Sequence, residues 1–535
     1  MSSSACAGAI VAQLCAQGVA DAVLAPGSRS APLALALARA EADGLLRLHV
    51  RFDERSAGFL ALGLAKASGR PVPVVTTSGT AVGNLLPAVM EAHHGGVPLL
   101  VVSADRPAAL VGFGANQTTS QATIFQGFVR WSARVSSAAP AASWTAQAAR
   151  ACLLASGLGS RNPGPVQLNV ELDQPLVGDE GPWPEVRAVT QASPGSVEPV
   201  VLPAGPRTLL VCGDASAEVG AQAAEAAGAG RVPLLAEPSS NTRSASLRSG
   251  RLLLGSALAD EVERVVVFGH PTLSRPVSRL LARDDVELIV VSATPEWVDP
   301  GWRAARVVPA VLLEPADPGW LGRWRAADAA VSAGVDALLG RQRVLTGPAV
   351  AAAVIAAVGD GVLMLGNSQP IRDADLAALT RARVFANRGL AGIDGTISTA
   401  VGVGLASGEP VTLLCGDLTF LHDGNGLAAG LGERRPDLRI VVADDDGGSI
   451  FATLEYGDDR YAGAFERVFG TPSGVDPVAL AAAHGLPACR VRTAAELADA
   501  LARPIEGLDV VVATVDRAGR RALNDALNAL AARVV

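Results

Sequence analysis

The sequence predicts an α/β fold built from three doubly wound domains, each with a parallel sheet. Short apolar runs alternate with alanine-rich helical patterns, which is typical of parallel strands joined by helices. At 535 residues the chain exceeds the size at which a single hydrophobic core stops growing, so several domains are expected. Two proline-rich or polar passages divide the alternating pattern into three blocks.

The first block predicts a domain over residues 1–180. An amphipathic helix opens it, and helical patterns such as APLALALARA and ERSAGFLALGLAKA separate the strands. Its strand-like runs are DAVLA, LLRLHV, PVPVVT, PLLVVS and VQLNVELDQPL. Residues 176–206 are rich in Pro, Gly, Asp and Glu, which predicts a surface linker to the next domain.

The second and third blocks predict domains over residues 200–325 and 345–535. The strand-like runs of the second are TLLVCGD, VPLLAEP, VERVVVFGHPTLS and DVELIVVSATPEW. Those of the third are GVLMLGNS, ARVFANRG, VTLLCGD, LRIVVADDD and LDVVVATVDR. Most turns of the second block carry no charged group that can be assigned to chemistry. Its GHPT segment is interpreted as an ordinary strand-to-helix connection with His270 at the surface, and a ligand-binding turn is the alternative.

Composition and charge exclude several classes of protein. Hydrophobic residues make up 49% of the chain and charged residues 18%, as expected of a folded globular protein. The net charge of −8 and the lack of a basic run argue against a nucleic-acid partner. No basic region precedes the first apolar residues and no run is long enough to span a membrane, so a cytoplasmic protein without signal peptide is expected. Six scattered cysteines predict reduced thiols.

The strongest chemical signal is a pair of strands that end in acid and glycine. Asp417 follows VTLLCG, and Asp444, Asp445 and Asp446 follow LRIVVA. Both turns should lie at the carboxyl edge of one parallel sheet, where their carboxylates could bind one Mg²⁺ and, through it, a diphosphate. The alternative is that these acids only cap the helices that begin near Thr419 and Ser449.

The first block carries four polar turns that should lie on one sheet edge. They are APGSRS (25–30), RFDERS (51–56), TTSGTA (76–81) and SADRP (103–107). Glu54 stands between an apolar strand and an apolar helix, which suggests a buried carboxyl with a perturbed pKa. Its alternative is an exposed helix-capping acid paired with Arg55.

Two other enzyme classes on similar folds fit poorly. No strand end carries G-x-G-x-x-G with an acid at the end of the next strand, so a dinucleotide-binding dehydrogenase is not expected. No G-x-S-x-G turn follows a strand, and the six histidines show no arrangement that matches a Ser-His-Asp hydrolase.

The acid and glycine turns resemble the signature of the thiamine-diphosphate enzymes. Gly416-Asp417 and Gly447-Gly448 fit its frame, but Asp445 stands where the family usually has asparagine. Within the superfamily, the chain is most similar to the carboligases that join 2-oxoglutarate to isochorismate in menaquinone biosynthesis. The segments that carry this likeness are APGSRSAPL, HVRFDERSAGFLALGLAK, TSGTAVGNLLPAVMEA, SADRP, GANQT, ANRGLAGIDGTISTA, GDLTFLHD and GGSIF.

The resemblance implies thiamine diphosphate and Mg²⁺, or Mn²⁺, as cofactors. Asp417 and Asp445 would bind the metal through their side chains and Gly447 through its carbonyl, with Asp444 as a rival of Asp445. Glu54 would hydrogen-bond N1′ of the aminopyrimidine, and Ile393 would hold the cofactor in its bent form. The other residues implied to contact the cofactor are Ser78, Gly79, Ser368, Gly416, Leu418, Gly447 and Gly448.

The two implied substrates, 2-oxoglutarate and isochorismate, carry several carboxylates, which arginine binds bidentately. The residues implied to bind them are Ser28, Arg29, Arg106, Asn116, Gln117, Ser368, Arg372, Arg388 and Phe451. Four residues are implied to be catalytic: Glu54, Arg29, Gln117 and Arg388. The alternative for each arginine is a surface ion pair, with Asp373 or Asp375 for Arg372. Phe451 is either a pocket wall or a core residue.

The resemblance also implies that the cofactor bridges two subunits, so a homodimer is expected and a homotetramer is compatible with it. Two other hypotheses remain at this point. One is another thiamine-diphosphate carboligase or decarboxylase, and the other is an inactive binding or scaffold protein on the same fold. The set of arginines favours the carboligase of menaquinone biosynthesis over an enzyme that acts on pyruvate, because pyruvate needs a single carboxylate site.

Overall fold

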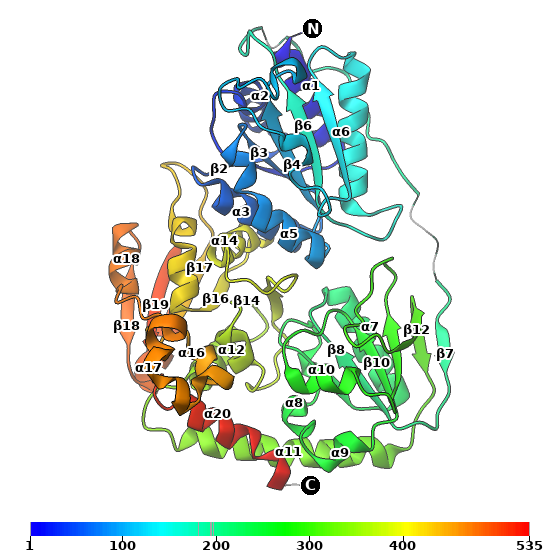
Figure 1. Cartoon of the computed structure of the whole chain (residues 1–535), viewed down its shortest axis with the longest axis vertical. Helices are drawn as coiled ribbons and strands as arrows, with labels where there is room; N and C mark the ends of the chain where they lie inside the picture. Colours follow the sequence, from blue (N-terminus) through cyan, green and yellow to red (C-terminus); the bar gives the residue numbers. More distant parts are fainter. Residues whose placement is uncertain (1, 180, 193–194, 196, 534–535) are drawn as a thin grey trace. The chain divides into compact units, whose positions relative to one another are not determined.

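The structure is a computed structural model that describes residues 2–179, 181–192, 195 and 197–533 (Figure 1). It is an α/β protein in which every paired strand among these residues runs parallel to its neighbour. The chain forms two compact units. The first contains residues 1–195, 389–409 and 422–436, and the second contains residues 196–388, 410–421 and 437–535.

The first unit is built on a six-stranded sheet with the order β2-β1-β3-β4-β6-β5. Its strands are β1 Asp21–Leu24, β2 Arg47–Val50, β3 Val72–Thr76, β4 Leu99–Asp105, β5 Trp131–Ser136 and β6 Val166–Glu171. After β1 the chain adds β2 on one side and then β3 on the other, so the winding direction reverses there. Open α/β sheets bind ligands at such a reversal, beyond the carboxyl ends of the strands.

Helices cover both faces of this sheet. One face packs against α1 Ser3–Ala16, α2 Ala31–Ala42 and α6 Ala141–Ser156, which bury Ile10, Leu37 and Trp144 in a common core. The other helices of the unit are α3 Glu54–Ser68, α4 Thr80–Gly83, α5 Leu86–Gly95 and α14 Thr396–Ser407. Helices α3 and α14 pack closely because glycines face the partner backbone: a Cβ at Gly63 would lie 2.1 Å from the carbonyl oxygen of Thr399.

The second unit contains a five-stranded sheet with the order β12-β11-β10-β8-β9 and a two-stranded sheet, β13-β7. Their strands are β7 Val200–Leu202, β8 Thr208–Cys212, β9 Leu234–Ala236, β10 Arg264–Phe268, β11 Glu287–Val291, β12 Ala304–Val308 and β13 Val311–Leu313. The five-stranded sheet reverses its winding between β8 and β10. The turns after these strands meet there, with two backbone hydrogen bonds between Asp214 and His270.

A six-stranded sheet with the order β15-β14-β16-β17-β19-β18 completes the second unit. Its strands are β14 Val362–Leu365, β15 Arg383–Ala386, β16 Val411–Gly416, β17 Leu438–Asp444, β18 Ala488–Val491 and β19 Leu508–Thr514. The winding reverses between β14 and β16. Neighbouring strands β16 and β17 pair up to Gly416 and Ala443, so the turns that follow them lie side by side, as the sequence predicts.

The remaining helices connect these strands. They are α7 Ala217–Gly230, α8 Gly250–Leu253, α9 Ala257–Asp260, α10 Arg275–Leu281, α11 Pro318–Gly340, α12 Gly347–Val358, α13 Gln369–Ala374, α15 Asp417–His422, α16 Ser449–Ala452, α17 Ala462–Phe465, α18 Pro477–Ala483, α19 Ala494–Leu501 and α20 Arg520–Asn528. The long helix α11 buries Trp320, Trp324 and Val331 together with Leu527 of α20.

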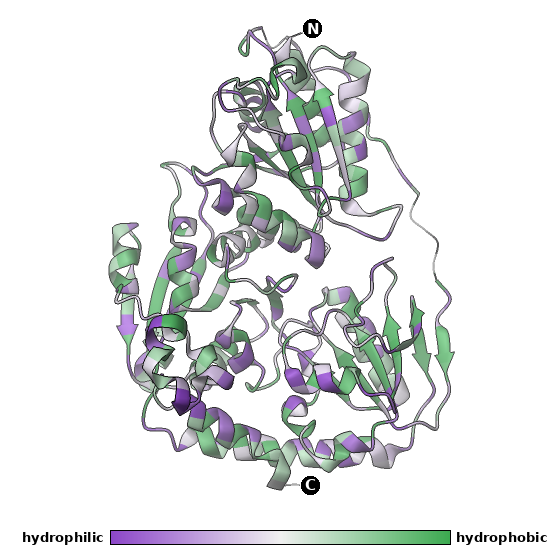
Figure 2. Cartoon of the chain, in the orientation of Figure 1, coloured by the Kyte–Doolittle hydropathy of each residue, from purple (hydrophilic) through white to green (hydrophobic). Residues whose placement is uncertain are grey.

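Hydrophobic residues concentrate in the strands and hydrophilic residues gather on helices and loops (Figure 2). The cores of both units are therefore formed where sheets meet their covering helices. All six cysteines are free thiols, and burial raises the pKa of Cys6 and Cys152 to about 12, so both stay protonated. Within the described residues, no helix combines the length and the apolar character needed to cross a membrane.

Candidate active site

The turns after β16 and β17 bring together the acids that the sequence predicts as metal ligands. Asp417 is the first residue of α15, and Asp445 directly follows β17. Asp417 is 3% exposed, and its Oδ2 accepts a hydrogen bond of 2.7 Å from the backbone N–H of Gly447. Burial, and next the charge of Asp445, raise the pKa of Asp417 to about 7. The two carboxylates therefore interact electrostatically across the neighbouring turns that follow β16 and β17.

Asp445 has one oxygen that the protein leaves without a partner. Its Oδ1 is buried and finds no hydrogen-bond donor among the described residues, while the side chain also bonds Ser449. Burial raises the pKa of Asp445 to about 6, although Arg517 and Arg520 oppose the rise. An unpartnered buried carboxylate oxygen is costly, which is understandable if it serves as a ligand to a cation.

The rival ligand Asp444 is already engaged. Its Oδ2 accepts from Nη1 of Arg490 at 2.5 Å, and it is the last residue of β17. The alternative that these acids only cap helices holds for one of the two helices. Asp417 begins α15, but the N-cap of α16 is Gly448, which makes no side-chain hydrogen bond.

Gly447 shapes the turn between Asp445 and α16. Its φ of +147° is one that residues with a Cβ rarely adopt, and an added Cβ would lie 2.3 Å from both the carbonyl oxygen of Gly470 and Nη1 of Arg517. Gly448 continues the turn by donating its N–H to the carbonyl of Gly470 at 2.7 Å. The backbone here is fixed, with the Gly447 N–H aimed at Asp417.

Gly447→Ala is expected to lower the free energy of unfolding by about 2–4 kcal/mol, because it adds a steric overlap to an unfavourable φ. Urea denaturation followed by circular dichroism measures this. Gly474→Ala is the matched control, since Gly474 has φ +64° but open space around its Cβ position, so only the backbone penalty applies. Equal losses in the two variants would show that the Gly447 turn is not sterically constrained.

The carboxylates of Asp417 and Asp445 fit a hard cation that also takes ligands from water and from a bound phosphate. No cluster of three or more His, Cys, Asp or Glu side chains with metal-binding geometry occurs in the part of the chain that the structure describes. Two carboxylates and nearby carbonyls suit Mg²⁺, which usually completes its octahedron with water and phosphate oxygens. The arrangement therefore fits a metal that couples protein to a bound diphosphate.

Arg388 lies just beyond β15 and is 1% exposed. Its Nη1 donates to Oδ1 of Asn367 at 2.8 Å and its Nη2 donates to Oγ1 of Thr272 at 2.7 Å. Its Nε is buried and has no partner among the described residues. The surface ion pair considered for Arg388 is therefore wrong, since this guanidinium is buried and held by neutral oxygens.

Arg372 and Ser368 lie nearby, at the start of α13. Nη1 of Arg372 donates to the carbonyl oxygen of Ser368 at 2.6 Å. Burial and the charge of Arg388 lower the pKa of Arg372. Asp373 instead binds Arg520, and Asp375 binds Arg251 at 2.7 Å, so the ion-pair alternative for Arg372 is also wrong. Ser368 has φ +69°, an unfavourable value for a residue with a side chain.

Phe451, in α16, is half-buried rather than fully in the core. Its ring centroid lies 5.8 Å from that of Phe469, which stacks on Tyr456 at 4.8 Å. This small aromatic cluster covers the Gly448 turn, where an added Cβ would meet the Phe451 ring at 2.7 Å. Both alternatives for Phe451 remain open, because one face of the ring packs and part of it stays exposed.

In the first unit, Glu54 is the first residue of α3 and is half-buried, so the expectation of a buried carboxyl is wrong. The capping role belongs to Asp53, whose Oδ1 accepts from the N–H groups of Arg55 and Ser56. Oε2 of Glu54 accepts from Nδ2 of Asn84 at 3.3 Å. The pairing with Arg55 is not formed, since Arg55 donates to the carbonyl of His422. The carboxylate is oriented but accessible.

A hydrogen-bonded group forms beyond β3 and β4 in the same unit. Arg106 is buried, and its Nη1 donates to Oγ of Ser78 and, at 3.1 Å, to the carbonyl of Gln117. Nε2 of Gln117 donates back to the carbonyl of Ser78 at 2.9 Å, and Gly79, at φ +81°, donates its N–H to Gln121. The structure thus brings Arg106, Ser78, Gly79 and Gln117 together.

The remaining predicted residues of this unit are more accessible. Arg29 is half-buried, and its Nη1 donates to the carbonyl of Leu172 at 2.8 Å. Burial, followed by the charge of Arg106, lowers the pKa of Arg29. Ser28 and Asn116 are exposed, and Ile393 is half-buried. Free donors at Arg29 next to an exposed loop suit the binding of an anion.

Four residues near Arg388 or Arg106 were not predicted from the sequence. Thr272 and Asn367 bind Arg388, Glu237 binds the turn that contains Thr272, and Gln121 ties Gly79 to Asn169. The segment GHPTL is the one signal that could have pointed to Thr272, because it ends a buried strand at a winding reversal. Nothing local distinguishes Glu237 from an ordinary acid after a strand.

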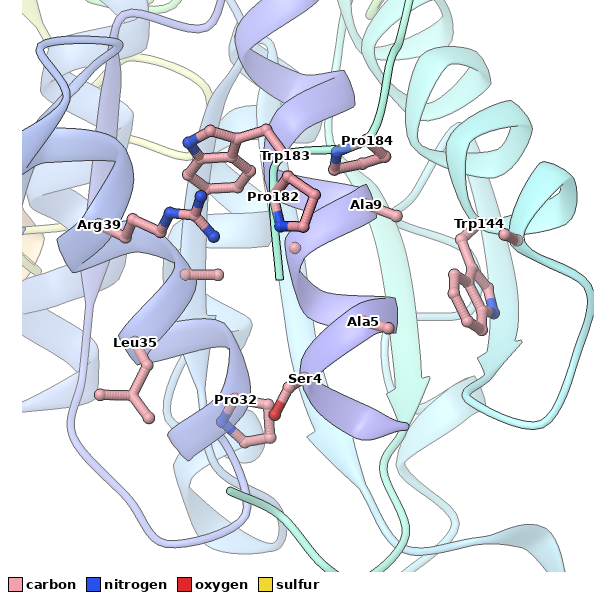
Figure 3. Close-up of a pocket in the computed structure, with 13 residues that line it drawn as sticks. Ser4, Ala5, Ala9, Pro32, Leu35, Arg39, Trp144, Pro182, Trp183 and Pro184 are labelled. Carbon is pink, nitrogen blue, oxygen red and sulfur yellow. The ribbon is translucent and has the colours of Figure 1, made fainter. Parts of the chain in front are cut away.

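A cavity of about 160 Å³ lies elsewhere in the first unit, between α1, α2 and the segment at 182–184 (Figure 3). Arg39 lies over the ring of Trp183 at 4.3 Å, and the indole N–H donates to Asp43 at 2.7 Å. None of the predicted site residues lines it. The cavity is mostly apolar and offers no group suited to catalysis.

Two regions of the chain match models of known protein families. Residues 5–126 match the family model described as the N-terminal TPP binding domain of thiamine pyrophosphate enzymes, and residues 366–515 match the corresponding C-terminal TPP binding domain. These two regions contain the Glu54 helix and the acidic turns that follow β16 and β17. The chain is thus a thiamine-diphosphate enzyme in class.

Close relatives of known name cover nearly the whole chain. A protein of Kineococcus radiotolerans is 52% identical over 530 residues, which are 95% of both chains. One of a Nocardioides species is 49% identical and covers 99% of this chain and 98% of its own. One of Rhodococcus erythropolis is 45% identical, with coverages of 98% and 99%. All three are named 2-succinyl-5-enolpyruvyl-6-hydroxy-3-cyclohexene-1-carboxylate synthase, and the chain belongs to this family.

Proposed function

We propose that this enzyme decarboxylates 2-oxoglutarate and adds the succinyl unit to isochorismate in a Stetter-like 1,4-addition. The products are 2-succinyl-5-enolpyruvyl-6-hydroxy-3-cyclohexene-1-carboxylate and CO₂, on the route to menaquinone. The observation that carries the proposal is the family membership over nearly the whole chain. The acidic turns that follow β16 and β17 and the arginines at the sheet edges support it.

Thiamine diphosphate and a divalent metal are the proposed cofactors. Asp417, Asp445 and the Gly447 carbonyl would bind Mg²⁺ or Mn²⁺, and the engagement of Asp444 by Arg490 supports Asp445 as the second side-chain ligand. When bound, thiamine diphosphate supplies the nucleophilic carbon and accepts the electron pair left by loss of CO₂. Glu54 would bind its aminopyrimidine. The other proposed contacts are Ser78, Gly79, Ser368, Ile393, Gly416, Leu418, Gly447 and Gly448.

The substrates need several carboxylate-binding groups. Arg29 lies next to an exposed loop, and the Nε of Arg388 has no hydrogen-bond partner among the described residues. Arg106 donates to Ser78 and Gln117, which supports a role in shaping the site as well as in binding. The other proposed substrate contacts are Ser28, Asn116, Gln117, Ser368, Arg372 and Phe451.

The proposed domains are a pyrimidine-binding domain over 1–180, a central domain over 200–325 and a diphosphate-binding domain over 345–535. Residues 1, 180 and 535, which mark three of these bounds, lie outside the described residues. A cofactor that contacts the first and third domains would bridge two subunits, so we propose a homodimer or a tetramer made of two dimers. The six free thiols support action in the cytoplasm.

The proposal predicts that the purified protein consumes isochorismate only when 2-oxoglutarate, thiamine diphosphate and Mg²⁺ are all present. Isochorismate absorbance is followed over time, and pyruvate replaces 2-oxoglutarate in the control. With pyruvate the rate should fall at least about 100-fold, because its methyl group leaves a buried carboxylate site unpaired. Equal rates with both oxoacids, or cofactor binding without isochorismate consumption, would identify a different carboligase.

A further inference from the structure

The middle sheet ends in an acid that has no role in the proposed chemistry. Glu237 follows β9, is 6% exposed, and lies at the carboxyl edge where the winding of the five-stranded sheet reverses between β8 and β10. Its Oε1 accepts from the backbone N–H of Leu273 at 2.8 Å. Its Oε2 is buried and has no partner among the described residues. Such an edge is where open α/β sheets usually bind ligands.

The turn that Glu237 holds is also the turn that holds Arg388. Leu273 directly follows Thr272, whose hydroxyl oxygen accepts from Nη2 of Arg388 at 2.7 Å. The other end of the turn is fixed separately, by the two backbone hydrogen bonds between Asp214 and His270. Glu237 is therefore the contact that anchors the end of the turn nearest to Arg388.

We propose that Glu237 is a positioning residue for Arg388, acting through the Thr272–Leu273 turn on the orientation of its guanidinium group. This inference rests on the proposed function, in which Arg388 binds a substrate carboxylate. The second block, which shows no chemistry in its sequence, would then contribute to the substrate site without touching the substrate. At the carboxyl edge of the five-stranded sheet, the Glu237 side chain would then occupy the place where a ligand usually binds.

The charge state of Glu237 fits such a role. Burial raises the pKa of Glu237 to about 8, against the opposing effects of the Leu273 N–H hydrogen bond and of Arg388, so the carboxyl is mostly neutral at pH 7. A neutral carboxyl still accepts the Leu273 N–H but leaves the charge of Arg388 available to an anion. The other titratable or charged groups that act on Glu237, or on which it acts, are Asp375, Asp214, Cys212 and Arg372.

Three variants test the proposal. Glu237→Ala removes the acceptor and leaves the Leu273 N–H buried without a partner, so KM for the substrate bound by Arg388 should rise about tenfold with kcat changed less than about twofold. Thr272→Val should give the same pattern. Glu237→Gln keeps an acceptor of the same shape and should restore KM at pH 7. The wild-type KM should rise above pH 8, where Glu237 becomes charged, and Glu237→Gln should not show this rise. Glu218→Ala, at an exposed position of α7, is the control and should change nothing.

Crystal structures of Glu237→Ala and Glu237→Gln give a readout that needs no activity. The contact between Thr272 Oγ1 and Arg388 Nη2 should be lost in the first and kept in the second. If it is kept in both, or if Glu237→Ala lowers kcat and leaves KM unchanged, the positioning role is wrong. If the wild type does not consume isochorismate with 2-oxoglutarate, the proposed function fails, and the crystal structures still decide whether Glu237 orients Arg388.

Discussion

Replacing Glu54 by glutamine is expected to lower turnover by about 10²–10⁴-fold, the range typical of lost proton-transfer assistance. Glutamine has the same shape and can still accept from Asn84, so the helix and the affinity for thiamine diphosphate should be kept within about threefold. What is lost is the carboxylate at the first position of α3, which the proposed function assigns to the aminopyrimidine ring. Steady-state rates and calorimetric titration of the cofactor measure the two effects separately.

Two controls separate this role from simple damage to the helix. Glu185→Gln, at an exposed position of the same unit, should leave both the rate and the cofactor affinity unchanged. Asp53→Ala removes the N-cap of α3 and should lower the free energy of unfolding by about 1 kcal/mol. If Glu54→Gln loses cofactor affinity in proportion to turnover, Glu54 acts in binding and not in activation.

The positions of the strands and of their polar ends were predictable from the sequence. Buried parallel strands are continuous apolar runs, so β4, β10 and β16 are recognisable, and the acid or glycine that ends each run marks the carboxyl edge. The convergence of Asp417 and Asp445 then follows from the pairing of β16 with β17. The structure confirms the parallel pairing of these strands.

Three strands at sheet edges, β5, β12 and β18, were missed, whereas the edge strands β2, β9 and β15 were predicted. β5 and β18 each end their sheets, and they contain exposed or half-buried residues such as Trp131 and Arg490. An edge strand pairs on one side only and can be partly solvated, so its sequence can lack the apolar run that identifies a central strand. β7 lies inside the predicted linker at 176–206 for the same reason: it is a three-residue strand of a two-stranded sheet.

Contacts between distant segments were also beyond prediction. Glu237, Thr272 and Arg388 come from three separate turns, and no spacing in the sequence relates them. The half-buried state of Glu54 was missed because its neighbour Asp53, and not Glu54, accepts the free N–H groups of the helix. Which of two adjacent acids caps a helix depends on the backbone dihedrals at its start, which the sequence leaves open.

Replacing Asp417 by asparagine is expected to weaken Mg²⁺ binding, and with it the binding of thiamine diphosphate, by at least about 100-fold. The variant loses one of two carboxylates at a site where the described residues offer no third metal-binding side chain. Folding should survive, because asparagine can still accept the Gly447 N–H and removes a charge from a position that is 3% exposed. The metal-free variant should therefore unfold at a temperature no lower than the wild type.

The neighbouring acids decide whether this loss is specific to the metal. Asp444→Asn should leave Mg²⁺ affinity within about threefold, because its carboxylate is already bound to Arg490, although it should destabilise that ion pair. Asp445→Asn should weaken binding to an intermediate degree, since the amide oxygen can replace the unpartnered Oδ1 as a ligand but carries no charge. Calorimetric titration of all three variants with Mg²⁺ and thiamine diphosphate gives the order directly. A larger loss in Asp444→Asn than in Asp445→Asn would exchange the roles of the two acids, and with them the assignment of the turn that follows β17.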